Sequence, residues 1–151
     1  MKGLIHIYTG DGKGKTTASL GLSIRAAGRG RRVVIMQFLK GDDTGELHIF
    51  KDIENIQVFR NSKQYGFFFQ MNDEDKAAVM KEHNDMLDKA RQLMDAGEVD
   101  LLVLDEIMAT YNLGALDKAK ADDIVLNKAE NVELVLTGRD APQHWRDAAD
   151  Y

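Results

Sequence analysis

Apolar residues recur along the chain in five short runs, and longer segments of mixed polarity separate them. The runs are Leu4–Tyr8, Val33–Leu39, Ile56–Phe59, Leu101–Leu104 and Val132–Leu136. Runs of this length predict strands, and strands that are apolar on both faces are typical of parallel sheets covered by helices on both sides. We therefore expect an α/β protein with three layers and a mainly parallel central sheet.

The segments between the runs predict helices, and the longest covers Asp73 to about Ala96. Acidic residues at its beginning suit the positive end of a helix, and Gly97 is suited to end it. One stripe of this helix is apolar and comprises Val79, Met80, Met86, Leu87, Ala90, Leu93 and Met94. His83 lies on the same stripe. We expect it to be a packed histidine and not a metal ligand, because no second histidine lies at ligand spacing.

A glycine-rich loop, Thr9 to Thr17, lies between the first predicted strand and a helix expected over Ala18–Ala27. Its ATP-binding candidates are Gly10, Asp11, Gly12, Lys13, Gly14, Lys15, Thr16 and Thr17. Glycines let backbone N–H groups converge on phosphate oxygens at the positive end of a helix. Lys15 would add a charge, and the Thr16 hydroxyl would bind Mg²⁺. The loop therefore predicts a phosphate site of the P-loop type.

One departure from the P-loop pattern is Thr9, which stands where the first glycine is expected. A glycine-rich turn that binds nothing is the alternative. The order of strand, loop and helix favours the phosphate site, and we expect a P-loop NTPase-like fold.

A second acidic motif follows the fourth apolar run, where Asp105 and Glu106 end the predicted strand Leu101–Leu104. Ligands collect at the carboxyl edge of open α/β sheets, so one of these carboxylates could bind Mg²⁺ directly or through water. Taken alone, the pair could be two solvated acids; together with Lys15 and Thr16 it favours binding of a nucleoside triphosphate. Arg139 would follow the last strand at the same edge, as a phosphate ligand or as a surface arginine.

Three consecutive phenylalanines, Phe67, Phe68 and Phe69, precede the long helix. In an extended segment Phe68 would point away from the other two. The sequence leaves two interpretations open: core filling, or an aromatic wall for a flat second substrate.

Composition limits the class of protein. The 151 residues suit one domain, covering 1–151, and carry a formal net charge of −5, which disfavours nucleic acid as a partner. The basic cluster at 29–32 is expected to be a solvated turn. There is no cysteine, which excludes disulfides and thiolate metal sites, and no apolar run approaches the roughly 18 residues of a membrane span. We expect a soluble, cytoplasmic protein with no membrane partner.

With these motifs in view, the chain resembles the P-loop corrinoid adenosyltransferases, which act on cob(I)alamin or cob(I)yrinic acid a,c-diamide. The resemblance covers nearly the whole length and rests on five segments: Tyr8–Thr17, Arg25–Gly30, Gln37–Gly41, Val103–Glu106 and Leu136–Arg139. Gln37–Gly41 is the most diagnostic, because generic P-loop ATPases lack it, and Thr9 is itself a family habit.

The resemblance implies a transferase that moves the 5′-deoxyadenosyl group of ATP to Co(I) of a corrinoid and releases triphosphate. Lys15, Thr16 and Glu106 would act at the reacting ATP, and Thr16, Asp105 and Glu106 would bind Mg²⁺, with Glu106 favoured for direct contact. Phe67 and Phe69 align with aromatic positions that press on the lower face of the corrin. The family expectation is a homodimer, and the reduced cobalt calls for an electron donor such as a flavoprotein.

The chain departs from the family in two respects. Phe69 stands where some members have tryptophan. The chain also begins at the first strand and stops at Tyr151, so that a terminal strand and tail are expected to be absent. Two rival functions stay open at this point: a P-loop phosphotransferase or ATPase, and a non-catalytic nucleotide- or corrinoid-binding paralogue. The natural corrinoid and the roles of Arg25 and Arg139 are left undetermined.

Overall fold

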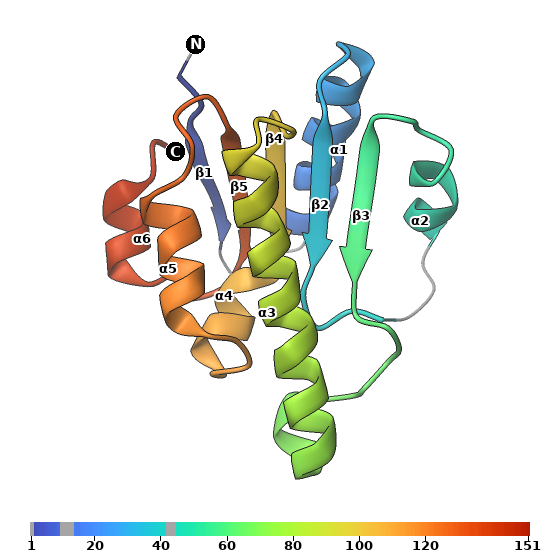
Figure 1. The fold of residues 1–151 in the computed structure, drawn as a ribbon, viewed down its shortest axis with the longest axis vertical. Helices are drawn as coiled ribbons and strands as arrows, with labels where there is room; N and C mark the ends of the chain where they lie inside the picture. Colours follow the sequence, from blue (N-terminus) through green and yellow to red (C-terminus); the bar gives the residue numbers. More distant parts are fainter. Residues whose placement is uncertain (1, 10–13, 42–44) are drawn as a thin grey trace.

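The computed structural model describes residues 2–9, 14–41 and 45–151. Within these residues the chain forms one five-stranded sheet in the order β1-β5-β4-β2-β3, with every neighbouring pair parallel (Figure 1). The strands are β1 (Ile5–Thr9), β2 (Val33–Gln37), β3 (Ile56–Arg60), β4 (Leu101–Asp105) and β5 (Glu133–Gly138). The expected α/β class and parallel sheet are confirmed.

Helices cover both faces of the sheet (Figure 1). They are α1 (Lys15–Gly28), α2 (Gly45–Phe50), α3 (Asp73–Asp95), α4 (Ile107–Asn112), α5 (Lys118–Leu126), α6 (Gln143–Ala148) and a short 3₁₀ helix, η1 (Phe68–Gln70). The long helix expected from Asp73 is α3, and it ends where predicted, since Gly97 has a left-handed φ of 69°. The first part of α3 projects beyond the sheet at the carboxyl ends of the strands (Figure 1).

Alternation along each strand divides the core into two layers. Val34 and Met36 of β2 belong to the cluster shared with α3, α4, α5 and α6, whereas Val33 and Ile35 belong to the cluster that packs on α1 and α2. Because both faces of β2 and β4 are buried, their sequences are continuous apolar runs and not alternating ones. This is why the apolar runs predicted the strands well.

The carboxyl edge of the sheet brings together the ends of β1, β5, β4 and β2. β5 lies between β1 and β4, so the strand before the glycine-rich loop and the strand with the acidic pair are not neighbours. Gly138, the last residue of β5, is closely packed, because a Cβ atom there would lie 2.8 Å from the Met108 sulfur of α4. The edge is therefore crowded, and the side chains at the strand ends can reach one another.

Two strand ends differ from the predicted runs. The run Val33–Leu39 stays a strand only to Gln37, because the chain turns at Leu39, which has a φ of 61°. β5 lies slightly later than the run Val132–Leu136 and continues to Gly138. Among the residues that the structure describes, no helix is both long and apolar enough to cross a lipid bilayer.

Candidate nucleotide and corrinoid site

The glycine-rich loop is described only from Gly14 onward; Gly10, Asp11, Gly12 and Lys13 lie outside the described residues. Gly14 precedes α1 with a left-handed φ of 101°, and a Cβ atom there would meet nothing within 4 Å. Glycine is thus needed here for its backbone conformation and not for space. Lys15, Thr16 and Thr17 form the first turn of α1, where a helix presents free N–H groups and a positive end.

Asp105 is the centre of a polar cluster at the end of β4, and its side chain is completely buried. Its Oδ1 accepts hydrogen bonds from the Thr137 hydroxyl at 2.6 Å and from the Thr16 hydroxyl at 3.1 Å. Its Oδ2 lies 2.6 Å from the ammonium of Lys40. The structure therefore joins Thr16 and Asp105, as expected, and the alternative of a solvated acid is wrong for Asp105.

Sequence reasoning missed the role of Lys40. The sequence marks Gln37–Gly41 as a family segment but indicates no partner for its lysine. The structure shows why β2 and β4 bring this lysine to Asp105: Gln37 is in register with Asp105, and the Phe38 N–H donates to the Asp105 carbonyl at 3.0 Å. A lysine shortly after β2 is therefore close to the end of β4. Pairing also explains how a fully buried carboxylate is accommodated.

Glu106 differs from Asp105 in its surroundings. It is half-buried, and its carboxylate makes no hydrogen bond to any residue within the described ranges. Its backbone is fixed instead: the N–H donates to the Thr137 hydroxyl at 2.9 Å, and the carbonyl accepts from the Thr110 hydroxyl at 2.7 Å. Direct contact of the Glu106 side chain with a metal ion stays a prediction.

Hard oxygen donors at this edge suit Mg²⁺, which takes hydroxyl, carboxylate, phosphate and water oxygens. If the site holds Mg²⁺, Thr16, Asp105 and Glu106 would supply the hydroxyl and the carboxylates. In the described part of the chain no group of three His, Cys, Asp or Glu side chains could hold a metal ion by itself. The donor set thus fits a magnesium ion that also takes oxygens from phosphate groups and water.

Backbone strain gathers at the same edge. Among the described residues, those with positive φ that are not glycine are Leu39, Glu106 and Asp140, which follow β2, β4 and β5. Such conformations cost about 1–3 kcal/mol each and persist where surrounding contacts impose them, often at functional sites. All three positions follow strands whose carboxyl ends lie at the edge where Asp105 contacts Thr16.

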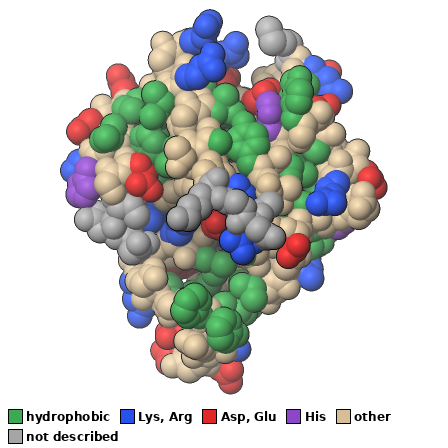
Figure 2. All heavy atoms as spheres, turned by 180° about the vertical axis from the view of Figure 1, so that it is seen from behind, with side chains coloured by type: hydrophobic (Ala, Val, Ile, Leu, Met, Phe, Trp, Pro, Cys, Tyr) green, Lys and Arg blue, Asp and Glu red, His purple; other side chains and the backbone are tan. Residues whose placement is uncertain are grey.

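The aromatic segment lies on the projecting end of the molecule. Phe67 and Phe69 are 69% and 67% exposed, and their rings stack with centroids 5.7 Å apart. Core filling by these two side chains, one of the two interpretations, is therefore wrong. The segment is also not extended, since η1 begins at Phe68, whose ring lies under the Lys76 ammonium. From the opposite side, Figure 2 shows hydrophobic side chains exposed on this end of the molecule.

The loop that follows β3 and precedes the aromatic segment is tied to α3 by Glu82. The carboxylate of Glu82 accepts hydrogen bonds from the Ser62 N–H at 2.9 Å, the Ser62 hydroxyl at 2.6 Å, the Tyr65 hydroxyl at 2.8 Å and the Asn61 amide at 3.2 Å. Burial alone would raise the pKa of Glu82, but these donors outweigh it and lower the pKa to about 2. The loop that leads to the exposed phenylalanines is therefore held to α3 by four hydrogen bonds.

Two arginines from the family segments have different locations. Arg139 is exposed and directly follows β5 at the carboxyl edge, so its possible contact with phosphates stays a prediction. Arg25 lies near the end of α1, at the opposite edge, where it lines a hollow of about 380 Å³ together with Leu101 and Glu133 from the beginnings of β4 and β5. Arg25 is therefore remote from the first turn of α1.

Comparisons with known proteins agree with this geometry. The family model described as ATP:corrinoid adenosyltransferase BtuR/CobO/CobP matches residues 1–151. A corrinoid adenosyltransferase of Escherichia coli strain K12 is 29% identical over 99% of this chain and 74% of its own length. One of Pseudomonas aeruginosa is 31% identical over 99% of this chain and 72% of its own length.

Two further similarities cover less of the relative. An uncharacterised Nostoc protein is 30% identical over 99% of this chain, which spans 43% of that relative. The solved structure of ATPases 2 and 3 of EssC from Geobacillus thermodenitrificans matches with a TM-score of 0.50 and 14% identity, over 92% of this chain and 28% of that one. The last similarity supports the P-loop NTPase-like fold alone. Together with the polar cluster at the carboxyl edge, the family match means that the chain belongs to the ATP:corrinoid adenosyltransferase family of transferases.

Proposed function

We propose that this chain carries out adenosyl transfer from ATP to a reduced corrinoid at the carboxyl edge of its sheet. The observation that supports the placement best is the contact of Thr16 with the buried Asp105 at 3.1 Å. It joins the helix turn after the glycine-rich loop to the acidic strand end. In P-loop proteins these two parts surround the phosphates and their metal ion.

In this proposal the loop residues 10–17 bind the triphosphate, and Lys15 neutralises part of its charge. Thr16 and Glu106 would hold Mg²⁺, with Asp105 orienting the Thr16 hydroxyl and assisting in holding the ion. Mg²⁺, when bound, would stabilise the charge that builds up on the departing triphosphate. The residues at this edge therefore stabilise a leaving group.

The chemical step needs no nucleophile from the protein. The electron pair of Co(I) attacks the ribose C5′ and forms the cobalt–carbon bond. The C5′–O bond breaks, and its electron pair leaves with triphosphate. The protein contributes by positioning the two substrates and by electrostatic stabilisation of the leaving group.

Phe67 and Phe69 are proposed to contact the flat corrinoid. Large aromatic side chains that are about two-thirds exposed are costly to leave in water, and a stacked pair offers a broad apolar surface. Packing against the lower face of the ring would displace the lower cobalt ligand and ease reduction of Co(II). The electron donor and a homodimeric state remain expectations from the family.

The test is incubation of the chain with ATP, Mg²⁺ and chemically reduced cob(I)alamin. A cobalt–carbon product with release of one triphosphate per corrinoid would support the proposal. ADP and phosphate would identify a phosphotransferase or ATPase, and ATP binding without turnover a binding paralogue; either result contradicts it. Lys15→Ala should lower both ATP affinity and transfer, by about 100-fold or more in transfer rate. Lys51→Ala, which changes an exposed lysine near α2, is the matched control.

A further inference from the structure

Two loops at the carboxyl edge pack against each other through their backbones. One is the β2 loop, residues 38–41, which carries Lys40; the other is the β3 loop, residues 61–66, which leads to the aromatic segment. The Asn61 N–H donates to the Lys40 carbonyl at 2.9 Å. At Gly41 an added Cβ would lie 2.0 Å from the Lys63 carbonyl oxygen, so the two backbones touch there. Neither loop can shift without the other.

Adjacent residues of α3 hold this pair of loops. Glu82 anchors the β3 loop through Asn61, Ser62 and Tyr65. His83 is fully buried and anchors the β2 loop, because its Nε2 accepts from the Leu39 N–H at 3.2 Å. Its Nδ1 donates to the Ala115 carbonyl at 2.8 Å, which fixes the tautomer that this contact requires. The helix therefore sets the position of both loops.

Lys40 connects the β2 loop to the carboxylate of Asp105 at the end of β4. The Lys40 ammonium is 2.6 Å from Asp105 Oδ2, and the other oxygen of Asp105 accepts from Thr16 and Thr137. The lysine side chain is 27% exposed, whereas that of Asp105 is fully buried. A buried carboxylate is sensitive to the loss of a cationic contact as close as that of Lys40, because burying a charge with less compensation is costly.

We propose that Lys40 is a positioning residue that links the aromatic segment to the nucleotide site. The β3 loop fixes the backbone of Lys40, the ammonium of Lys40 fixes Asp105, and Asp105 orients Thr16. A change in the β3 loop, such as contact of a corrinoid with Phe67 and Phe69, would thereby change the position of Thr16 and the affinity for Mg·ATP. This inference rests on the proposed function and adds a route by which the two substrate sites affect each other.

The first test is a double-mutant cycle on Mg·ATP binding, measured by calorimetry without corrinoid, so that no transfer can occur. Lys40→Met should weaken binding about tenfold, because it removes a charge near the polyanion and releases Asp105. Glu82→Gln, at the far anchor, should weaken it about threefold. The double variant should bind as Lys40→Met does, because the effect of Glu82 passes through Lys40. Lys40→Arg keeps the charge and should retain most of the affinity.

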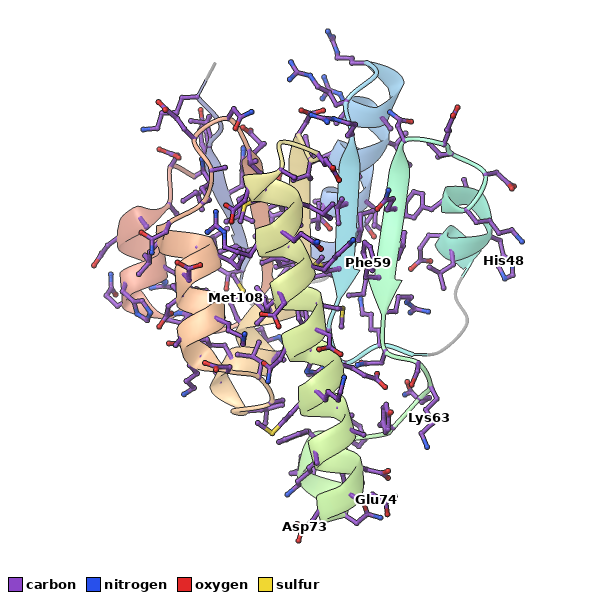
Figure 3. All side chains as sticks on the ribbon, viewed as in Figure 1. His48, Phe59, Lys63, Asp73, Glu74 and Met108 are labelled. Carbon is purple, nitrogen blue, oxygen red and sulfur yellow. The ribbon has the colours of Figure 1, made fainter. Side chains whose placement is uncertain are left out.

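Glu74→Gln is the matched control: the same substitution on the same helix, at an exposed residue for which the described part of the chain offers no hydrogen-bond partner. Figure 3 shows Glu74 at the tip of α3 and Lys63 on the β3 loop, nearer to the sheet. Glu74→Gln should leave the affinity unchanged. An unchanged affinity in Glu82→Gln, or additive losses in the double variant, would overturn the proposal.

A second test needs no nucleotide, so it separates this inference from the proposed function. Hydrogen exchange of the Asn61 amide, which is bonded to the Lys40 carbonyl, should be at least about threefold faster in Lys40→Met than in the native protein. Unchanged exchange would contradict the link even if ATP binds. Faster exchange in a protein that fails to bind ATP would support the link and refute the nucleotide site instead.

Discussion

Thr137 and Asp105 are joined across neighbouring strands by a hydrogen bond of 2.6 Å, which the threonine hydroxyl donates. The same hydroxyl accepts the Glu106 N–H at 2.9 Å. One side chain on β5 therefore contacts both the Asp105 carboxylate at the end of β4 and the backbone of Glu106, the next residue. This explains how a strand inserted between β1 and β4 contributes to the site although it carries none of the phosphate-binding motif.

Thr137→Val should disturb both acids while keeping the shape of the side chain. The Asp105 carboxylate loses its shortest hydroxyl donor, and we expect a loss of about 1–3 kcal/mol in the free energy of unfolding, together with weaker Mg·ATP binding. Urea unfolding and calorimetry measure the two effects. Thr137→Ser retains the hydroxyl and should behave nearly as the native protein. If the valine variant matched the native protein in both measurements, Thr137 would have no ordering role.

Phe69→Ala should spare ATP binding and slow the reaction with Co(II) corrinoids under reducing conditions. The fold-loss in transfer rate should be roughly tenfold smaller with pre-reduced Co(I) than with Co(II). The reason is that the Phe69 side chain is proposed to act by displacing the lower cobalt ligand, which matters for the reduction of Co(II). Single-turnover rates with the two oxidation states give the comparison. Ile49→Ala, which removes a 61% exposed apolar side chain from α2, is the control. Equal loss with both corrinoids would contradict the role in ligand displacement.

Gly41→Ala should destabilise the chain by about 1–3 kcal/mol, because a Cβ there would meet the Lys63 backbone and force the two loops apart. Gly45→Ala, at the beginning of α2, meets nothing within 4 Å and should be neutral or slightly stabilising. Urea midpoints of the two variants provide the measurement. A Gly41→Ala variant as stable as Gly45→Ala would show that the loops separate freely.

His83 should make stability depend on pH. Burial lowers the pKa of His83 below its usual value of 6.5, against the opposing effects of the Ala115 carbonyl and the Glu82 charge. The unfolded chain then binds the proton more readily than the folded chain does. The contribution of neutral His83 to the free energy of unfolding is complete above about pH 6.5. It is lost as the pH falls from there through the pKa of His83 in the folded chain. Unfolding free energies at pH 7.5 and 5.5 should therefore differ less in His83→Gln than in the native protein. An identical pH dependence would show that His83 does not titrate differently on folding.

Apolar runs and helix signals predicted most of the fold, because the central strands are buried on both faces and α3 has a clear stripe and glycine stop. The motifs also predicted that Thr16 and Asp105 would lie at the same edge of the sheet, where the structure joins their side chains. Thr137 and Lys40 could not be assigned partners in the same way, since their contacts depend on strand order and register: β5 beside β4, and Gln37 opposite Asp105. The exposure of Phe67 and Phe69 likewise depends on where α3 projects beyond the sheet.

The left-handed residues Leu39, Glu106 and Asp140 have a consequence for protein engineering. Replacing such a residue by glycine would relieve the strain in its backbone and raise the melting temperature, yet each follows a strand that ends at the edge of the proposed nucleotide site. Selection for heat resistance alone would therefore favour changes beside the proposed nucleotide site. At these three positions a gain in melting temperature should lower the turnover rate. Substitutions on the solvent faces of α3 and α5 should show this trade-off much less.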